Sequence, residues 1–105
     1  MNTDIIISEY LLKKAIDKGF KCKSYEIITI YDIMKWLRDE KNIHIEIYTC
    51  ASGYDYIISN TPKLGGSDRH WSESEGPNDG GCWDFYEQAV IAGIEHVLDE
   101  ELIKL

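Results

Sequence analysis

The pattern of hydrophobic and polar positions divides the chain into segments of helical period and segments of strand period. Between Asp4 and Lys18 the apolar residues recur at steps of three and four, which predicts an amphipathic helix. Gly19 follows directly and suits the left-handed conformation that ends many helices. Phe20 can then fold back onto the last turn as the accompanying apolar contact. The first element is therefore predicted to be a helix that stops at Gly19.

A second helix is predicted over about Ile30 to Asn42. Thr29 stands three residues before Asp32, so its hydroxyl can accept a backbone N–H while the carboxylate favours the positive end of the helix. Trp36 belongs to a broad apolar stripe, and we expect it to be deeply buried between this helix and the sheet. On that expectation, Trp36→Ala would cost about 3 to 5 kcal/mol of stability.

The next segment, IHIEIYTC, has the two-residue period of a strand. Its isoleucines, Ile43, Ile45 and Ile47, alternate with other residues. The run YDYIIS after Gly53 is rich in aromatic and β-branched residues. Together they predict an antiparallel hairpin over about residues 43–59, closed by a short loop that contains glycine. The preceding segment, 21–28, gives no clear signal and is treated as a connector.

The segment 60–83 reads as one long loop. It holds five of the eight glycines and both prolines, and long loops in compact domains are usually functional, disordered or interrupted by a short element. A short third strand is expected near Arg69 to Ser74, with Trp71 packing inward. If Trp71 is instead a contact residue, Trp71→Ala should cost about 1 kcal/mol or less.

The last segment, DFYEQAVIAGIEHVLDEELIKL, has helical period throughout, with Asp84 placed to cap its start. Gly93 costs a mid-helix site about 1 kcal/mol relative to alanine, which indicates that another element, the sheet, crosses closely there. The chain is thus predicted to be a single α+β domain over residues 1–105. Its small antiparallel sheet of two to three strands packs on helices in the order α-α-β-β-(β)-α.

Two segments resemble a known group of proteins. The first is TIYDIMKWLRDEKNIHIEI, with Lys35, Trp36, Leu37, Arg38 and Asp39 at the matching positions, and the second includes Tyr86, Glu87, Ala89, Gly93 and Leu98. They resemble small bacterial proteins of unassigned activity, commonly associated with phages or mobile elements, that carry a KWLR helix-strand motif and a YEEALEAGLEEAL-type terminal helix. The resemblance covers about Thr29 to Tyr56 and Trp83 to Leu102.

The resemblance implies an α+β fold with helices behind a small sheet, and it implies no reaction and no catalytic residue. The segment from Lys63 to Gly81 is where the chain departs from these proteins, which have a shorter connection there. Any activity peculiar to this chain is therefore sought around the long loop.

Charge and length narrow the classes of function. The chain has 105 residues and a formal net charge of −8, which fits one domain and disfavours nucleic-acid binding by bulk electrostatics. No secretory signal or apolar run of membrane-spanning length is present, so a cytoplasmic location without membrane association is predicted. Three cysteines without a C-x-x-C pair are expected to be reduced thiols: Cys22, Cys50 and Cys82.

The long loop contains residue types that bind metals, at Asp68, His70, Glu73, Glu75, Asp79 and Cys82. Their spacing matches neither the paired ligands of structural zinc nor the regular oxygen ligands of a calcium loop, so no metal and no cofactor is predicted. A catalytic thiolate–imidazole pair of Cys82 and His70 would need a geometry that the sequence does not supply. No catalytic residue is therefore assigned, and the glycines lack a phosphate-binding fingerprint.

The remaining titratable residues are given surface roles. The consecutive acids Asp99, Glu100 and Glu101 are expected to solvate the outer face of the last helix, because neighbouring positions on a helix point in different directions. His44 and His96 are expected to be surface residues.

Aromatic residues gather around the hairpin and the loop, where they either pack the core or form a contact surface. The candidate contact patch consists of Tyr54, Tyr56, His70 and Trp71. The sequence favours a small, acidic, non-enzymatic interaction domain from a phage or mobile element, with a host protein or a second copy as its partner. The alternative is a small enzyme or ligand-binding domain whose site is built by loop 60–83, in a pocket lined by His70, Trp71 and an acid.

Overall fold

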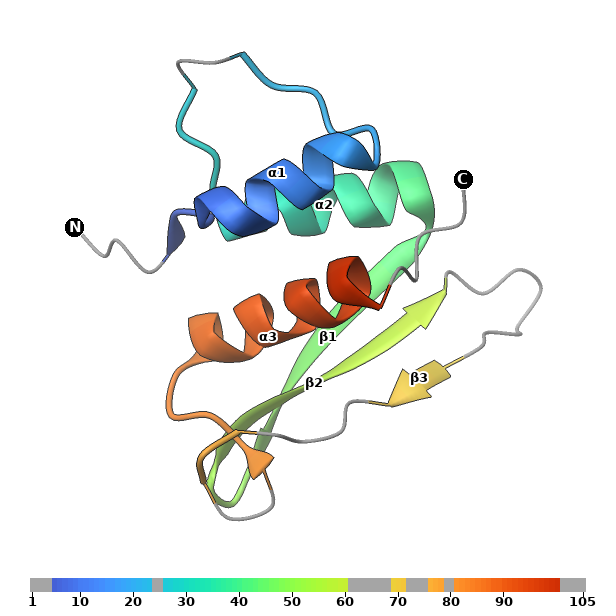
Figure 1. Cartoon of the computed structure of the whole chain (residues 1–105). Helices are drawn as coiled ribbons and strands as arrows, with labels where there is room; N and C mark the ends of the chain where they lie inside the picture. Colours follow the sequence, from blue (N-terminus) through green and yellow to red (C-terminus); the bar gives the residue numbers. More distant parts are fainter. Residues whose placement is uncertain (1–4, 24–25, 61–68, 72–75, 79–80, 101–105) are drawn as a thin grey trace.

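The computed structural model describes residues 5–23, 26–60, 69–71, 76–78 and 81–100, with the backbone alone at 60 and 69–71. Figure 1 shows the elements in chain order: α1 (Glu9–Asp17), α2 (Ile30–Lys41), β1 (Ile43–Cys50), β2 (Gly53–Asn60), β3 (Arg69–Trp71) and α3 (Tyr86–Asp99). The fold is α+β with a small antiparallel sheet, as the sequence predicts. No described helix combines the length and the apolar character that a membrane span requires.

The sheet has the strand order β1-β2-β3. Strands β1 and β2 form the predicted hairpin, paired from Ile43 opposite Asn60 to Cys50 opposite Gly53. The expected third strand is found as β3, where Trp71 pairs with Ile57 on the backbone. The inward packing predicted for the Trp71 side chain lies outside the described residues, as does the end of the predicted strand at Ser74.

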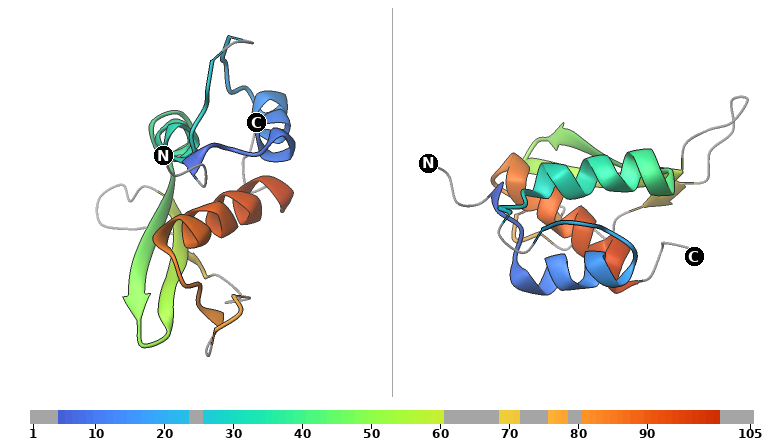
Figure 2. Two further views of the ribbon diagram at one scale, coloured as in Figure 1. Left: turned by 90° about the vertical axis from the view of Figure 1, so that its left-hand side faces the viewer. Right: turned by 90° about the horizontal axis from the view of Figure 1, so that it is seen from above.

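In the left view of Figure 2 helix α3 lies below α1 and α2 and beside the hairpin, and α2 also contacts β1 directly. Helix α3 packs on β1 and β2 with one side and contacts α1 and α2 with the other, so its described length is buried on several faces. The core combines residues from all three helices and from the hairpin. Its fully covered members include Ala15, Ile30, Ile33, Leu37, Ala89, Val90, Ile94 and Val97.

Gly93 marks the closest approach of α3 to the sheet. A Cβ atom built there would lie 2.7 Å from Ile45 Cγ2 and 3.4 Å from two ring atoms of Tyr56. Both neighbours point from the sheet into the core, where Tyr56 is 6% exposed. The missing side chain therefore lets α3 sit against β1 and β2, which confirms the crossing predicted from the sequence.

Helix α2 begins at the predicted cap. The Asp32 backbone N–H donates to Thr29 Oγ1 at 3.2 Å, and the Thr29 N–H donates to Asp32 Oδ2 at 2.8 Å, which completes a capping box. The helix ends one residue before the predicted limit, because Asn42 adopts a left-handed conformation with φ of 57°. This turn leads directly into β1.

Trp36 is not deeply buried, so that prediction is wrong. The residues of α2 that face the core are Ile30, Ile33 and Leu37, at steps of three and four. Trp36 lies beside this stripe, half-buried, with its ring 5.4 Å from that of Phe20 and with Lys41 Nζ 5.7 Å above it. The face of α2 that is buried is narrower than its apolar stripe, and Trp36 covers the edge of the core instead of filling it.

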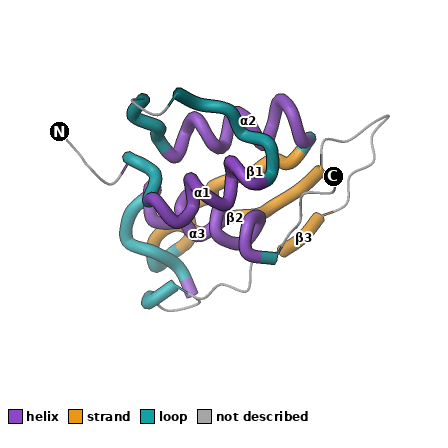
Figure 3. The backbone as a smooth tube through the Cα atoms, turned by 45° about the horizontal axis from the view of Figure 1, so that its top comes forward, coloured by secondary structure: helices purple, strands orange, loops and turns teal. Residues whose placement is uncertain are grey.

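Helix α1 starts at Glu9, five residues later than predicted. Ser8 caps it by accepting the Leu11 N–H at 3.2 Å, and the preceding residues run alongside the entry to α2. There the Ile7 N–H donates to the Ile28 carbonyl at 2.9 Å. The predicted stop is confirmed, with Gly19 at φ of 110°. The described residues between α1 and α2 appear in teal in Figure 3.

Helix α3 also begins later than predicted. Phe85 occupies the cap position, and its N–H donates to Gln88 Oε1 at 3.1 Å. Asp84 does not cap the helix, because its carboxylate accepts the Asn78 side-chain amide at 2.7 Å. A contact with a loop residue thus replaces the local cap.

Removal of the capping hydroxyl is expected to destabilise the protein measurably. Thr29→Ala should lower the free energy of unfolding by about 1 kcal/mol, since the capping box loses the hydroxyl that accepts the Asp32 N–H. Urea unfolding followed by circular dichroism measures this difference. Thr29→Ser keeps the hydroxyl and should retain most of the stability, and equal losses in both variants would contradict a capping role.

Candidate functional site

A pocket opens between α3, β2 and Trp83, and we call it the α3 pocket. Its volume is about 560 Å³, and its lining residues are Tyr56, Trp83, Gln88, Ile91, Ala92, Glu95, His96, Asp99 and Glu100. Seven of these nine belong to α3 or to its C-cap, so successive turns of one helix form most of the wall. The lining combines an acidic side, an aromatic side and a small apolar patch.

A chain of hydrogen bonds runs along one wall of the α3 pocket. The Tyr56 hydroxyl lies 2.8 Å from His96 Nδ1, and His96 Nε2 lies 3.0 Å from Glu100 Oε2. The carboxylate can only accept, so Nε2–H donates to Glu100 and, in the neutral ring, Nδ1 accepts from the Tyr56 hydroxyl. The His96 side chain is 12% exposed. Both ring nitrogens are therefore engaged, and His96 is not the surface residue that the sequence predicted.

Two further carboxylates face the same space from α3. Asp99 Oδ1 accepts the Tyr10 hydroxyl at 2.9 Å and the Lys14 ammonium at 3.0 Å, which ties α3 to α1. Glu95 is exposed at the pocket, but partial desolvation raises its pKa, and the Asp99 carboxylate one turn away raises that pKa further. Within the described residues no hydrogen bond or ion pair neutralises Glu95. The pocket thus contains a carboxylate whose negative charge is disfavoured.

The aromatic side of the α3 pocket is formed by Trp83 and Tyr56, whose ring centroids lie 5.8 Å apart. Aromatic faces attract cations, and carboxylates do so more strongly. The described lining residues include no lysine or arginine. The chemistry of the pocket therefore favours a positively charged group with an apolar stem, which Ile91 and Ala92 can cover.

The raised pKa of Glu95 predicts a pH-dependent effect of its removal. A carboxyl whose pKa is raised by folding stabilises the fold while protonated, and that contribution is lost as the pH rises through the folded pKa. Glu95→Gln should therefore be more stable than the wild type at about pH 7, with the gap closing towards about pH 4. Urea midpoints at the two pH values measure it. A variant that is less stable at neutral pH would show that Glu95 has a stabilising partner.

The structure describes the side chains of only two of the four residues in the predicted contact patch. Tyr54 is half-buried and packs edge-on against Tyr86, with ring centroids 6.0 Å apart. Tyr56 is buried and is one of the lining residues of the α3 pocket. His70 and Trp71 lie on β3, and their side chains are outside the described residues. The structure therefore describes no shared surface for the four residues.

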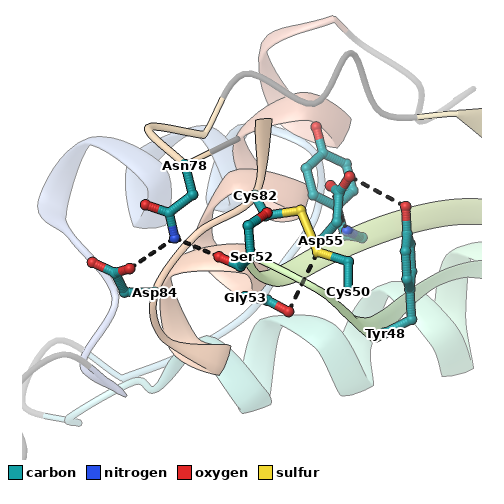
Figure 4. Close-up of a disulfide and its surroundings, with 9 residues drawn as sticks. Tyr48, Cys50, Ser52, Gly53, Asp55, Asn78, Cys82 and Asp84 are labelled. Atoms are coloured by element: carbon teal, nitrogen blue, oxygen red, sulfur yellow. Dashed lines mark hydrogen bonds between the residues drawn. A yellow bond between two sulfur atoms is a disulfide. The ribbon is translucent and has the colours of Figure 1, made fainter. Parts of the chain in front are cut away.

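The expectation of three reduced thiols is wrong, because Cys50 and Cys82 form a disulfide (Figure 4). Cys22 is free. The two bonded residues are 32 positions apart, so spacing could not pair them, but the hairpin turn and the loop bring them together at one end of the sheet. The bond also removes Cys82 from the thiolate–imidazole pair considered with His70.

A buried carboxylate lies next to this disulfide on the sheet. Asp55 is 2% exposed and accepts the Tyr48 hydroxyl at 3.2 Å and the Tyr56 backbone N–H at 2.8 Å (Figure 4). Burial, with the Asp55 charge as the next cause, raises the pKa of Tyr48. Because these two bonds are made within the sheet, we assign Asp55 a structural role. Among the described residues no cluster of three metal-binding side chains occurs.

Compared with known proteins, the chain matches no family model, no curated protein and no solved structure. The function is therefore argued from the α3 pocket itself. Sequence reasoning missed most of this pocket, because Gln88, Glu95 and His96 look like ordinary polar positions of a helix. The one sequence signal for this pocket is the pair of acidic residues one helical turn apart, Glu95 and Asp99.

Proposed function

We propose that the protein is a non-enzymatic interaction domain that accepts a positively charged side chain of a protein partner in the α3 pocket. The observation that carries this proposal is the carboxylate of Glu95 at a pocket that has an aromatic wall and no lysine or arginine among its described lining residues. A guanidinium or ammonium group placed there would relieve the repulsion between Glu95 and Asp99. It would also face the ring of Trp83.

The engagement of His96 supports a binding role over a catalytic one. A general base acts on a group that a substrate can reach, and His96 Nδ1 faces the hydroxyl of Tyr56, a residue that is only 6% exposed. The other ring nitrogen donates to Glu100. We therefore assign this hydrogen-bonded chain the role of holding the pocket wall in place.

The source of the protein and its partner also belong to the proposal. The resemblance of the KWLR segment and of the terminal helix supports an origin in a phage or mobile element, and the net charge of −8 supports a partner with a basic surface. A cytoplasmic location, and the choice between a host protein and a second copy as partner, stay predictions.

A pair of peptides that differ only in charge tests the proposal. Acetyl-Gly-Arg-Gly-amide is titrated into the protein and followed by NMR at the Trp83 indole N–H and at the α3 amides, with the citrulline peptide as the neutral counterpart. We expect the arginine peptide to shift these signals and the citrulline peptide to leave them in place. Glu95→Gln should weaken arginine binding by about fivefold, the effect of losing about 1 kcal/mol from an exposed ion pair.

Glu46→Gln is the matched control, because it removes the same charge from an exposed position of β1 outside the pocket. Its affinity for the arginine peptide should equal that of the wild type. Equal weakening in both variants would mean that only the overall charge attracts the peptide. Equal binding of the two peptides would mean that the pocket does not recognise a cation, and either result would sink the proposal.

A further inference from the structure

The disulfide ties the described loop residues 76–78 and 81–83, here called the Cys82 segment, to the end of the β1–β2 hairpin. Cys82 bonds to Cys50, the last residue of β1, as Figure 4 shows. The next residue, Trp83, forms an antiparallel bridge with Tyr54, in which both backbone hydrogen bonds measure 2.8 Å. Because the Trp83 ring also lines the α3 pocket, the covalent bond lies one residue from the pocket wall.

The fit between the Cys82 segment and the hairpin is close. A Cβ atom at Gly53, where φ is 138°, would lie 2.0 Å from the Trp83 carbonyl oxygen. The Asn78 side-chain amide donates to the Ser52 carbonyl at 2.6 Å. Position 53 therefore needs glycine for two independent reasons, its conformation and the approach of Trp83. The place of Trp83 is set by the hairpin end, through one covalent bond and a few hydrogen bonds.

The two bonded residues differ in their exposure to solvent. Cys82 is 4% exposed, whereas Cys50 is half-exposed, so we expect an attacking thiolate to react at Cys50. Cys50 Sγ also lies 3.4 Å from the Gly53 carbonyl oxygen. A disulfide sulfur has no hydrogen to donate, but a released Cys50 thiol can donate to this carbonyl. The hairpin end is thus able to accommodate the reduced state.

We propose that the Cys50–Cys82 disulfide is a reversible tether that regulates the α3 pocket, an inference that rests on the proposed function. A dithiol reductant opens it in two exchange steps. One reductant thiolate attacks the Cys50 sulfur, which breaks the Cys50–Cys82 bond and releases Cys82 as a thiolate. The second reductant thiolate then attacks the first reductant sulfur and releases Cys50. The protein takes up two electrons and two protons, and the dithiol leaves as a disulfide.

Opening the bond weakens the hold on Trp83 without removing it. In the oxidised state the covalent link and the bridge to Tyr54 act together, so the aromatic wall is ordered before a ligand arrives. In the reduced state only the non-covalent contacts order it, and part of that ordering has to be supplied on binding. The reduced protein therefore binds a cationic side chain more weakly.

The test compares oxidised and dithiothreitol-reduced protein in the Cys22→Ser background, which leaves only the two bonded cysteines. Hydrogen exchange at the Tyr54 and Trp83 amides reports on the tether, and titration with the arginine peptide reports on the pocket. We expect exchange at both amides to rise about tenfold on reduction. We expect affinity to fall about threefold to tenfold, and reoxidation of the same sample to restore both values. Far-ultraviolet circular dichroism checks that the fold persists throughout.

If reduction changes neither the amide hydrogen exchange nor the affinity for the arginine peptide, the proposed tether is wrong. Binding of the peptide in the oxidised state would still support the proposed function. Absence of binding in both states would overturn the proposed function and, with it, this regulation. Cys22→Ser compared with the wild type is the control, because Cys22 lies outside the bond and its replacement should alter neither readout.

Discussion

Ile33→Ala is expected to lower the free energy of unfolding by about 2 to 5 kcal/mol, because the deleted atoms leave a cavity in a packed core. Ile33 is 0% exposed and lies in the middle of the stripe of α2 that faces the core. A loss of this size is a large part of the roughly 5 to 15 kcal/mol that stabilises a small domain. Urea midpoints, with slopes checked for two-state behaviour, measure it.

Ile27→Ala provides the matched control, since it deletes the same atoms from a side chain that is 71% exposed. Its effect should stay within about 0.5 kcal/mol, as for a surface substitution. Similar losses at positions 27 and 33 would contradict the assignment of the α2 core face.

Gly93→Val is expected to destabilise the protein by about 3 kcal/mol, the upper part of the range for an overfilled core. Its Cβ would meet Ile45 Cγ2 at 2.7 Å, and its methyl groups would press further on the sheet. Thermal and urea unfolding measure the loss. Gly93→Ala should be milder, because about 1 kcal/mol of gained helix propensity offsets part of the same contact.

A double-mutant cycle separates the contact from a general weakening. Ile45→Ala removes the Cγ2 atom that opposes position 93. If the clash is the cause, Gly93→Val should cost clearly less in the Ile45→Ala background than in the wild type, by at least about 1 kcal/mol. Additive losses would show that the two positions do not press on each other.

The elements that the sequence predicted well are those whose signals are local. The capping box of Thr29 and Asp32 and the period-two pattern of residues 43–47 depend on neighbouring residues, and both are found in the structure. The predicted starts of α1 and α3 are wrong because contacts outside each helix hold the residues that precede it. Ile7 pairs with Ile28, and Asp84 binds Asn78, and hydrophobic period carries no information about either contact.

The candidate site was harder to predict for the same reason. The α3 pocket forms where Tyr56 of β2, Trp83 of the loop and one face of α3 meet, and these residues are far apart along the chain. The aromatic cluster in the sequence indicated Tyr56 as a candidate site residue. It did not indicate His96, the hydrogen-bonding partner of Tyr56. The disulfide followed no sequence spacing, since Cys50 and Cys82 meet only after the hairpin and the loop have folded.

Asp99 makes two bonds to α1, and these bonds compete with a ligand for its carboxylate in the α3 pocket. Asp99 already holds the Lys14 ammonium at 3.0 Å and the Tyr10 hydroxyl at 2.9 Å. A cation that binds the Asp99 carboxylate has to displace Lys14. The net free energy of binding is therefore small at Asp99 and larger at Glu95. A change in how firmly α1 packs on α3 alters the strength of the Lys14–Asp99 contact. Helix α1 therefore influences the affinity of the pocket for a cation without contacting that cation.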